Sequence, residues 1–155
     1  MPGTLRPLFA CLLAVMLPSC TGWPRGWMKA RSAASADGLS GAWLGTWQSG
    51  RSGHHGKLRC AVVPSKNGQW EYRYRATWAG FLCAGFTVRC HAVPDGPGRW
   101  KVHGEKDLGP VFGGVFTHEA RVTGDRMRAT YSAQMDHGVM ELRKVDDGAQ
   151  AAVTP

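Results

Sequence analysis

The chain has 155 residues and carries 19 lysines and arginines against 11 aspartates and glutamates, a formal net charge of +8 at pH 7. This length suits a single domain with one hydrophobic core and excludes a large multidomain protein. The chain contains 21 glycines and seven tryptophans and alternates polar with apolar residues over many short runs, which favours an all-β fold over a helical one.

The first 19 residues have the pattern of a lipoprotein signal peptide. Arg6 precedes an apolar run from Leu8 to Leu17, which is too short to span a membrane and suits the core of a secretory signal. The run ends in Leu17-Pro18-Ser19-Cys20, which resembles the bacterial lipobox. That resemblance implies removal of residues 1–19, acylation of Cys20 and delivery to the outer membrane, facing the periplasm or the exterior. Secretion after cleavage at Ala34-Ser35-Ala36 is the alternative.

Residues 20–38 are predicted to form a flexible linker that begins with the lipidated cysteine. The segment mixes Gly, Pro, Ser and Ala with three cations and shows no strand-like alternation. Trp23 and Trp27 beside these cations suit contact with a lipid interface, and exposure of both indoles in the linker is the alternative. At the other end of the chain, residues 147–155 are predicted to be a disordered tail.

Eight strands are predicted within a barrel domain of residues 39–146. In the first, Leu39–Ser49, Gly41, Trp43, Gly45 and Trp47 alternate with other residues, so both indoles lie on one face, and the glycines indicate close approach of another backbone. The others are predicted at Lys57–Pro64, Gln69–Ala79, Gly85–Val93, Arg99–Glu105, Gly114–Thr123, Arg126–Gln134 and Val139–Val145. Short links between them favour an eight-stranded antiparallel up-and-down barrel without an exposed edge.

The Leu-x-Gly-x-Trp sequence at Leu39, Gly41 and Trp43 is similar to the first strand of the calycin group, which includes lipocalins, fatty-acid-binding proteins and avidins. The resemblance implies that the tryptophan closes one barrel end beneath an arginine of the last strand. Arg143 would take that role over Trp43 or Trp47. The chain also resembles small uncharacterised bacterial secreted domains with Gly-x-Trp-x-Gly-x-Trp near the start and Asp-His-Gly near the end, here Asp136-His137-Gly138. This second resemblance implies no known activity.

Loops of an up-and-down barrel alternate between its two rims, and here one rim is predicted to be more elaborate. It gathers residues 50–56, 80–84, 107–113 and 135–138, whereas the other rim has short turns. The chain enters and leaves the barrel at the plain rim, so we expect the elaborate rim to point away from the membrane and to be the binding mouth. Its candidate ligand or partner residues are His54, His55, Phe81, Asp107, Phe112, Asp136 and His137.

No metal site, cofactor or catalytic residue is predicted. The rim histidines lack the fixed spacing of metal ligands, and no nucleophile motif or carboxylate pair occurs. His118 alternates in phase with apolar residues, which favours a hydrogen-bonded core histidine over a base. Hairpin register places the Cα atoms of Cys60 and Cys90 roughly 9–10 Å apart, both near Tyr74, which is too far for a disulfide. A bridge from Cys83 to either one stays open.

Outward strand positions carry many of the cations: Arg59, Arg73, Arg75, Arg89, Lys101, Arg121, Arg126 and Arg128. The simplest interpretation is a charged barrel wall that faces solvent. Anionic lipid headgroups or acidic envelope polymers are the partners that this charge would suit. Nucleic acid is not expected outside the cytoplasm. We therefore expect a non-catalytic envelope lipoprotein whose barrel binds a small apolar or amphipathic ligand or a lipid. An interaction protein resembling protease or lysozyme inhibitors, and a purely structural envelope protein, are the alternatives.

Overall fold

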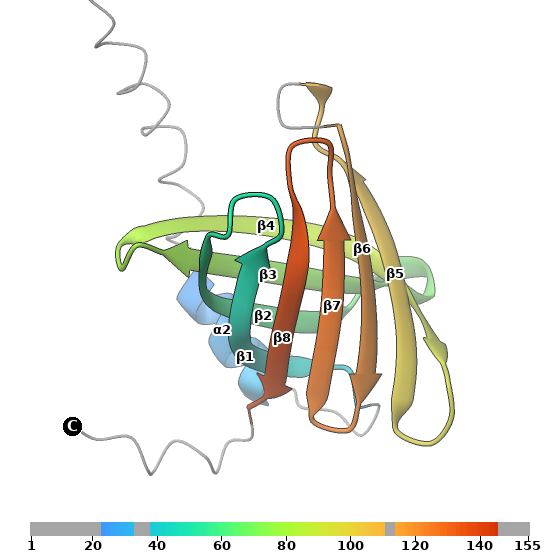
Figure 1. Cartoon of the computed structure of the whole chain (residues 1–155). Helices are drawn as coiled ribbons and strands as arrows, with labels where there is room; N and C mark the ends of the chain where they lie inside the picture. The colour runs from blue at the N-terminus through green and yellow to red at the C-terminus, as the bar shows by residue number, and fades with distance from the viewer. Residues whose placement is uncertain (1–22, 33–37, 111–113, 146–155) are drawn as a thin grey trace, which may run out of the picture.

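The computed structural model describes residues 23–32, 38–110 and 114–145. Eight antiparallel strands close into a barrel in chain order, with β1 paired to both β2 and β8 (Figure 1). They are β1 (Gly41–Ser49), β2 (His55–Pro64), β3 (Trp70–Trp78), β4 (Leu82–Pro94), β5 (Arg99–Asp107), β6 (Val115–Thr123), β7 (Arg126–Ser132) and β8 (His137–Lys144). Helix α2 (Trp23–Ser32) precedes them, and a 3₁₀ turn, η2 (Lys66–Gly68), links β2 to β3. The predicted all-β class and closed eight-stranded topology are confirmed, and the barrel is consistent with a calycin-like fold.

Strand β1 lies at the seam where the barrel closes. Trp43 is fully buried and Trp47 half-buried on the inner face, whereas Leu44 between them is exposed. A Cβ atom at Gly45 would lie 1.8 Å from the backbone oxygen of Glu141 in β8, so only glycine permits this pairing. The shared face of the two indoles is confirmed, and so is the close approach of another backbone at Gly45. At Gly41 the prediction is wrong, because a Cβ atom there would meet the side chain of Lys144 at 2.9 Å.

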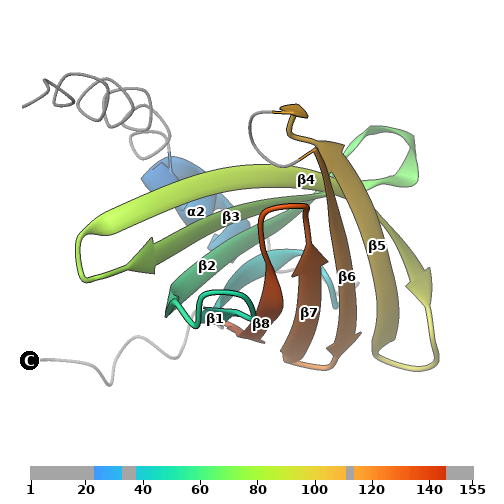
Figure 2. The ribbon, with the colours of Figure 1, turned by 45° about the horizontal axis from the view of Figure 1, so that its top comes forward.

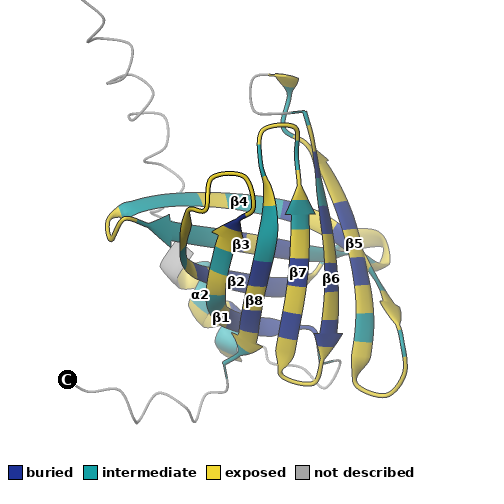
Figure 3. Ribbon diagram, in the orientation of Figure 1, coloured by how far each residue is buried: buried dark blue, intermediate teal, exposed yellow. Residues whose placement is uncertain are grey.

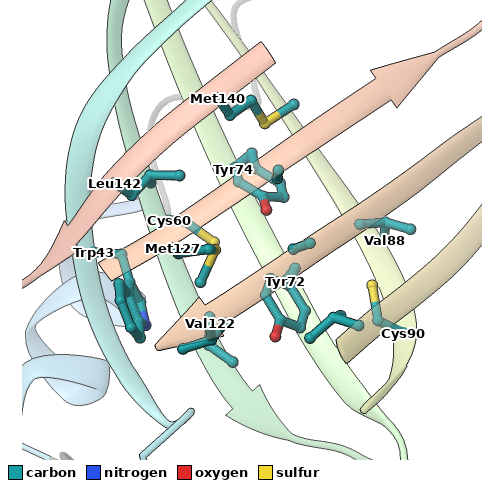
Figure 4. Packing of buried hydrophobic residues seen from close by; sticks show 14 of the residues in the cluster. Trp43, Cys60, Tyr72, Tyr74, Val88, Cys90, Val122, Met127, Met140 and Leu142 are labelled. Carbon is teal, nitrogen blue, oxygen red and sulfur yellow. The ribbon is translucent and has the colours of Figure 1, made fainter. Parts of the chain in front are cut away.

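Large side chains fill the half of the barrel in which β1 begins and β8 ends (Figure 4). Trp43, Tyr72 and Tyr74 are the largest fully buried side chains there. The ring centres of Tyr74 and Phe86 are 5.0 Å apart in a stacked arrangement. Buried and exposed residues alternate along the strands, as the bands of colour in Figure 3 show, because successive side chains point to opposite faces.

Lys144, not Arg143, covers the indole of Trp43. Arg143 points outward, with 64% of its side chain exposed and its guanidinium 3.7 Å from the carboxylate of Asp125. Lys144 is paired with Trp43 across the seam, its Nζ lies 5.5 Å from the indole ring centre, and it donates to the carbonyl of Gly38 at 3.1 Å. The predicted role of Arg143 is therefore wrong by one residue, which in a strand changes the face on which a side chain lies.

Helix α2 occupies part of the segment predicted to be a flexible linker, and that prediction is wrong for Trp23–Ser32. The helix lies against β1 and β2 on the outer wall of the barrel (Figures 1 and 2). Ala42 and Ala61 are paired across these strands and face outward, yet both are buried, because their small side chains leave room for the helix.

Residues of α2 contact the wall directly. Ala30 is fully buried, and the guanidinium of Arg59 lies 5.9 Å from the ring centre of Trp27. Trp27 therefore contacts the barrel wall and is not an exposed side chain in a flexible linker. The ten residues of α2 extend about 15 Å and lie against β1 and β2. Among the described residues, no helix has the length and apolar character needed to cross a membrane.

Candidate functional site

Asp136 ties the β1–β2 and β7–β8 loops together at the elaborate rim. Its carboxylate accepts hydrogen bonds from the Ser49 hydroxyl at 2.6 Å, from the Tyr131 hydroxyl at 2.9 Å and from the backbone N–H of His137 at 2.9 Å. The N–H of Gly50 donates to the carbonyl of His137 at 2.7 Å. Both oxygens of Asp136 are thus used to hold β1, β7 and β8 in place at the rim.

The Asp-His-Gly sequence closes the barrel at this rim. Gly138 is paired with Ser49 across the seam, and a Cβ atom on Gly138 would lie 2.1 Å from the carbonyl oxygen of Gln48. Gly45 makes the corresponding close approach further along the same seam. The two motifs that carry the sequence resemblance therefore both have a structural explanation at the β1–β8 pairing.

The remaining rim residues have local partners or face solvent. His54 in the β1–β2 connection and His55 at the start of β2 are both exposed, and His55 Nδ1 lies 3.3 Å from the carbonyl oxygen of Gly53. Asp107 accepts a hydrogen bond from the N–H of Gly109 at 2.7 Å, which shapes its own loop. Phe81 in the β3–β4 turn is 82% exposed. Phe112 lies outside the described residues, among which no three His, Cys, Asp or Glu form a metal-binding group.

An apolar cavity of about 200 Å³ lies inside the barrel on the side of the elaborate rim. Trp47 and Trp78 form one part of its wall, with ring centres 6.1 Å apart in an edge-to-face arrangement. The lining residues come from seven of the eight strands: Trp47, Leu58, Ala76, Trp78, Ala84, Phe86, Phe116, Tyr131 and Met140. The barrel is therefore filled at one end and hollow at the other.

Small inward side chains create this cavity. Ala76 and Ala84 are paired directly across β3 and β4, so neither strand places a large side chain at that level. From the sequence alone Ala84 is assigned to a rim loop, whereas in the structure it lies within β4 (Leu82–Pro94). Extending the alternation of Phe86 backward through Ala84 to Leu82 would have found it. Gly104 leaves no comparable space, since a Cβ there would lie 2.5 Å from the sulfur of Cys90.

A buried polar network crosses the filled half of the barrel. His118 is fully buried; its Nε2 lies 2.6 Å from the Tyr74 hydroxyl and its Nδ1 lies 3.7 Å from the sulfur of Cys90. Burial lowers the pKa of His118 to about 4, and the nearby His103 adds to this effect. The prediction of a hydrogen-bonded core histidine is confirmed.

Cys60, Cys83 and Cys90 of the barrel do not bridge one another. Cys60 and Cys90 are buried free thiols, and burial raises the pKa of Cys60 well above its ordinary value and that of Cys90 to about 12. Such thiols stay protonated at neutral pH and are weak nucleophiles. Because Cys60 and Cys90 are both free, the bridge from Cys83 to either of them, which the sequence leaves open, does not form. The predicted register holds for Cys60, which is paired with Tyr74 of β3. Cys90 is paired with Trp70, further along the same strand.

The chemistry that the cavity offers is apolar contact. Its polar lining groups are the two indole N–H groups and the Tyr131 hydroxyl; that hydroxyl is bonded to Asp136, and the indole of Trp47 lies 3.4 Å from the carbonyl of Thr77. None of the lining residues supplies a carboxylate, an imidazole or a thiol. Comparison of the chain with protein-family models, with curated proteins and with solved structures finds no match.

Proposed function

We propose that the barrel binds a small apolar molecule in the cavity beneath the elaborate rim, without catalysis. The observation that carries this proposal is the lining of the cavity, in which aromatic and aliphatic side chains surround about 200 Å³. Binding sites for small molecules are usually concave and mostly apolar, and an eight-stranded barrel can hold one small ligand. The resemblance of the first strand to calycins supports the same use of a barrel interior.

The size of the cavity limits the ligand. An apolar cavity of about 150 Å³ accepts benzene, so a cavity of about 200 Å³ accepts a single ring or the end of an alkyl chain. A long-chain lipid would place only its chain terminus there. The hydrogen bond from Tyr131 to Asp136 holds one lining ring in position, so the rim contacts support the shape of the cavity.

Methyl NMR spectra recorded during titration with toluene and 1-hexanol test the proposal. We expect the methyl signals of Leu58 and Met140 to shift, with a Kd on the order of 1 mM, while that of Met127 in the filled half stays in place. The Ala84→Leu variant should lose these shifts because its larger side chain occupies the cavity. The control is Thr46→Leu, which adds a similar side chain on the exposed face of β1.

Two results would contradict ligand binding. Unchanged Leu58 and Met140 signals in the native barrel would mean that the cavity stays closed, and a purely structural role would then be favoured. Shifts that persist in Ala84→Leu would place the probes elsewhere on the protein. Neither result would contradict the barrel fold, because the Thr46→Leu control shows whether the barrel tolerates a larger side chain.

The proposal includes anchoring in the cell envelope through an acylated Cys20, which rests on the lipobox resemblance alone. We expect wild-type protein expressed in a diderm bacterium to fractionate with membranes and the Cys20→Ser variant to be released into the soluble fraction. Mass mapping of the mature N-terminus under non-reducing conditions should find a diacylglycerol on Cys20. A disulfide between Cys20 and Cys83, or membrane retention of the variant, would contradict the anchor.

Two exposed side chains favour a second candidate, a protein-binding role for the same rim. Phe81 in the β3–β4 loop is 82% exposed and Met135 in the β7–β8 loop of the same rim is 59% exposed. Exposed large apolar side chains often mark interaction sites. This candidate corresponds to the inhibitor-like alternative. Inhibition of a secreted protease or a lysozyme by the native protein, lost in Phe81→Ser, would support it over ligand binding.

A further inference from the structure

Cations stand directly side by side on the outer wall of the barrel. Lys101 on β5 is paired with Arg121 on β6, and Arg121 is paired with Arg128 on β7. One step further along the sheet, Arg126 on β7 is paired with Arg143 on β8. All five side chains point outward, and together they are called the basic wall here.

This arrangement works against the stability of the sheet. Side chains directly opposite on neighbouring strands are about 5 Å apart, and like charges at such positions repel. Three of the five cations have an acid nearby: Arg128 lies 3.6 Å from Glu141, Lys101 lies 2.9 Å from Asp95, and Arg143 lies 3.7 Å from Asp125. Arg121 has no ion pair within the described part of the chain. The rows therefore keep an excess of positive charge that folding does not require.

The pairing across β3 and β4 differs, because Glu71 is opposite Arg89, although on the other side of β3 Arg75 is opposite Arg59 of β2. There Arg73 and Arg89 both lie beside the carboxylate of Glu71, at 2.5 and 4.0 Å. The carboxylate of Glu71 thus partly balances the charge of both arginines. The basic wall differs in carrying three like-charged pairs on adjoining strands, an arrangement that solubility alone does not require.

The basic wall is also hollowed. Two grooves of about 580 and 620 Å³ lie on the outer surface and share Arg121 and Arg128, so they adjoin one another. The row of Lys101, Arg121 and Arg128 crosses neighbouring strands at about 4.8 Å a strand, which gives a line of charge about 10 Å long. Glu119 and Glu141 also border the grooves, and the five cations outnumber them.

We propose that the basic wall binds a linear acidic polysaccharide. A row of cations in a hollow fits a chain of repeated carboxylate or sulfate groups, whereas a bilayer presents its headgroups on a flat surface. Single-stranded nucleic acid is usually held by aromatic side chains on which bases stack, and no Trp, Tyr or Phe lines either groove. Arginine suits sulfate and carboxylate because its planar guanidinium can donate two hydrogen bonds at once.

Binding of a fluorescent heparin fragment, measured against salt concentration with the chain from residue 20 onward, tests this proposal. Alginate serves as a carboxylate-only probe and dextran as a neutral one. We expect Arg121→Ser/Arg128→Ser to weaken heparin binding by on the order of tenfold and to reduce the slope of log Kd against log salt by about two. The control, Arg73→Ser/Arg89→Ser, removes the same net charge from the β3–β4 wall and should change Kd less than about twofold.

Thermal unfolding at low salt gives a second readout. Removal of Arg121 and Arg128 should raise the melting temperature by about 1–2 °C, because it removes a repulsive pair. If heparin binding weakened equally in both double variants, the effect would depend on net charge alone and the proposal would be overturned. Tighter binding of phosphatidylglycerol vesicles or of single-stranded DNA than of heparin at equal salt would overturn the assignment of a polysaccharide. Neither double variant touches the cavity lining, so failure here leaves ligand binding unaffected.

Discussion

We expect the Trp43→Ala variant to lose about 4 kcal/mol of unfolding free energy. The indole is fully buried, its N–H donates to the carbonyl of Leu39 at 3.1 Å, and Lys144 covers its face. Truncation would remove the buried apolar surface and leave a void. It would also deprive the Leu39 carbonyl and the Lys144 ammonium group of their contacts with the indole. Since small domains are stable by about 5–15 kcal/mol, the loss would be a large part of the total.

Urea unfolding followed by far-UV circular dichroism measures this loss. Leu44→Ala is the matched control, because Leu44 is the next residue of β1 and points outward with 42% of its surface exposed, so its loss should stay below about 1 kcal/mol. Trp43→Phe keeps an aromatic ring, so its loss of unfolding free energy should lie between those of Trp43→Ala and Leu44→Ala. If Trp43→Ala cost no more than Leu44→Ala, the role of Trp43 in closing the barrel would be wrong.

The seam of the barrel could be predicted because its residues obey local rules. Alternation in β1 assigns Trp43 and Trp47 to one face whatever the partner strand is, and the place of Gly45 between them indicates a close backbone contact. The last strand is predicted correctly as an element. The error concerns the face of this strand. The calycin resemblance implies an arginine and so points to Arg143, whereas Lys144 is in phase with the inward residues Met140 and Leu142.

Helix α2 could not be predicted from its own residues. A ten-residue segment that contains Gly26 and Pro24 is marginal as an isolated helix, and the packing that stabilises it comes from β1 and β2. The signal lay elsewhere in the chain. Ala42 and Ala61 break the pattern of polar residues on the outer face, and a pair of small apolar residues there indicates that something covers them.

The sequence predicts which rim is elaborate, but it does not predict the roles of the rim side chains. Loop lengths alone show which rim is elaborate, but Asp, His and Ser side chains serve turns as readily as they serve ligands. Asp136 illustrates this, because all its contacts are with Ser49, Tyr131 and the backbone of His137. The cavity depends on which inward positions are small at one level of the barrel, and this requires the register between strands, such as that of Ala76 with Ala84.

We also expect His118 to make the stability of the barrel depend on pH. Burial lowers its pKa from 6.5 to about 4 in the folded protein, so the folded state favours the neutral ring. The stability associated with this neutral ring is fully present above pH 6.5 and is lost as the pH falls toward 4, because the unfolded chain takes up a proton that the folded barrel excludes. A shift of this size corresponds to about 3 kcal/mol.

The measurement is urea unfolding at pH 7 and at pH 4.5 for the native protein and two variants. Carboxylates also titrate in this range, so the informative quantity is the difference between proteins. The native protein should lose about 2–3 kcal/mol more than His118→Gln, which keeps a polar group near Tyr74 but does not titrate. Tyr74→Phe leaves the imidazole buried and should retain the native pH dependence, although it is less stable at both pH values. Equal losses in the native protein and His118→Gln would mean that protons reach His118 in the folded barrel, and the filled half of the barrel would then be more open to water than its packing indicates.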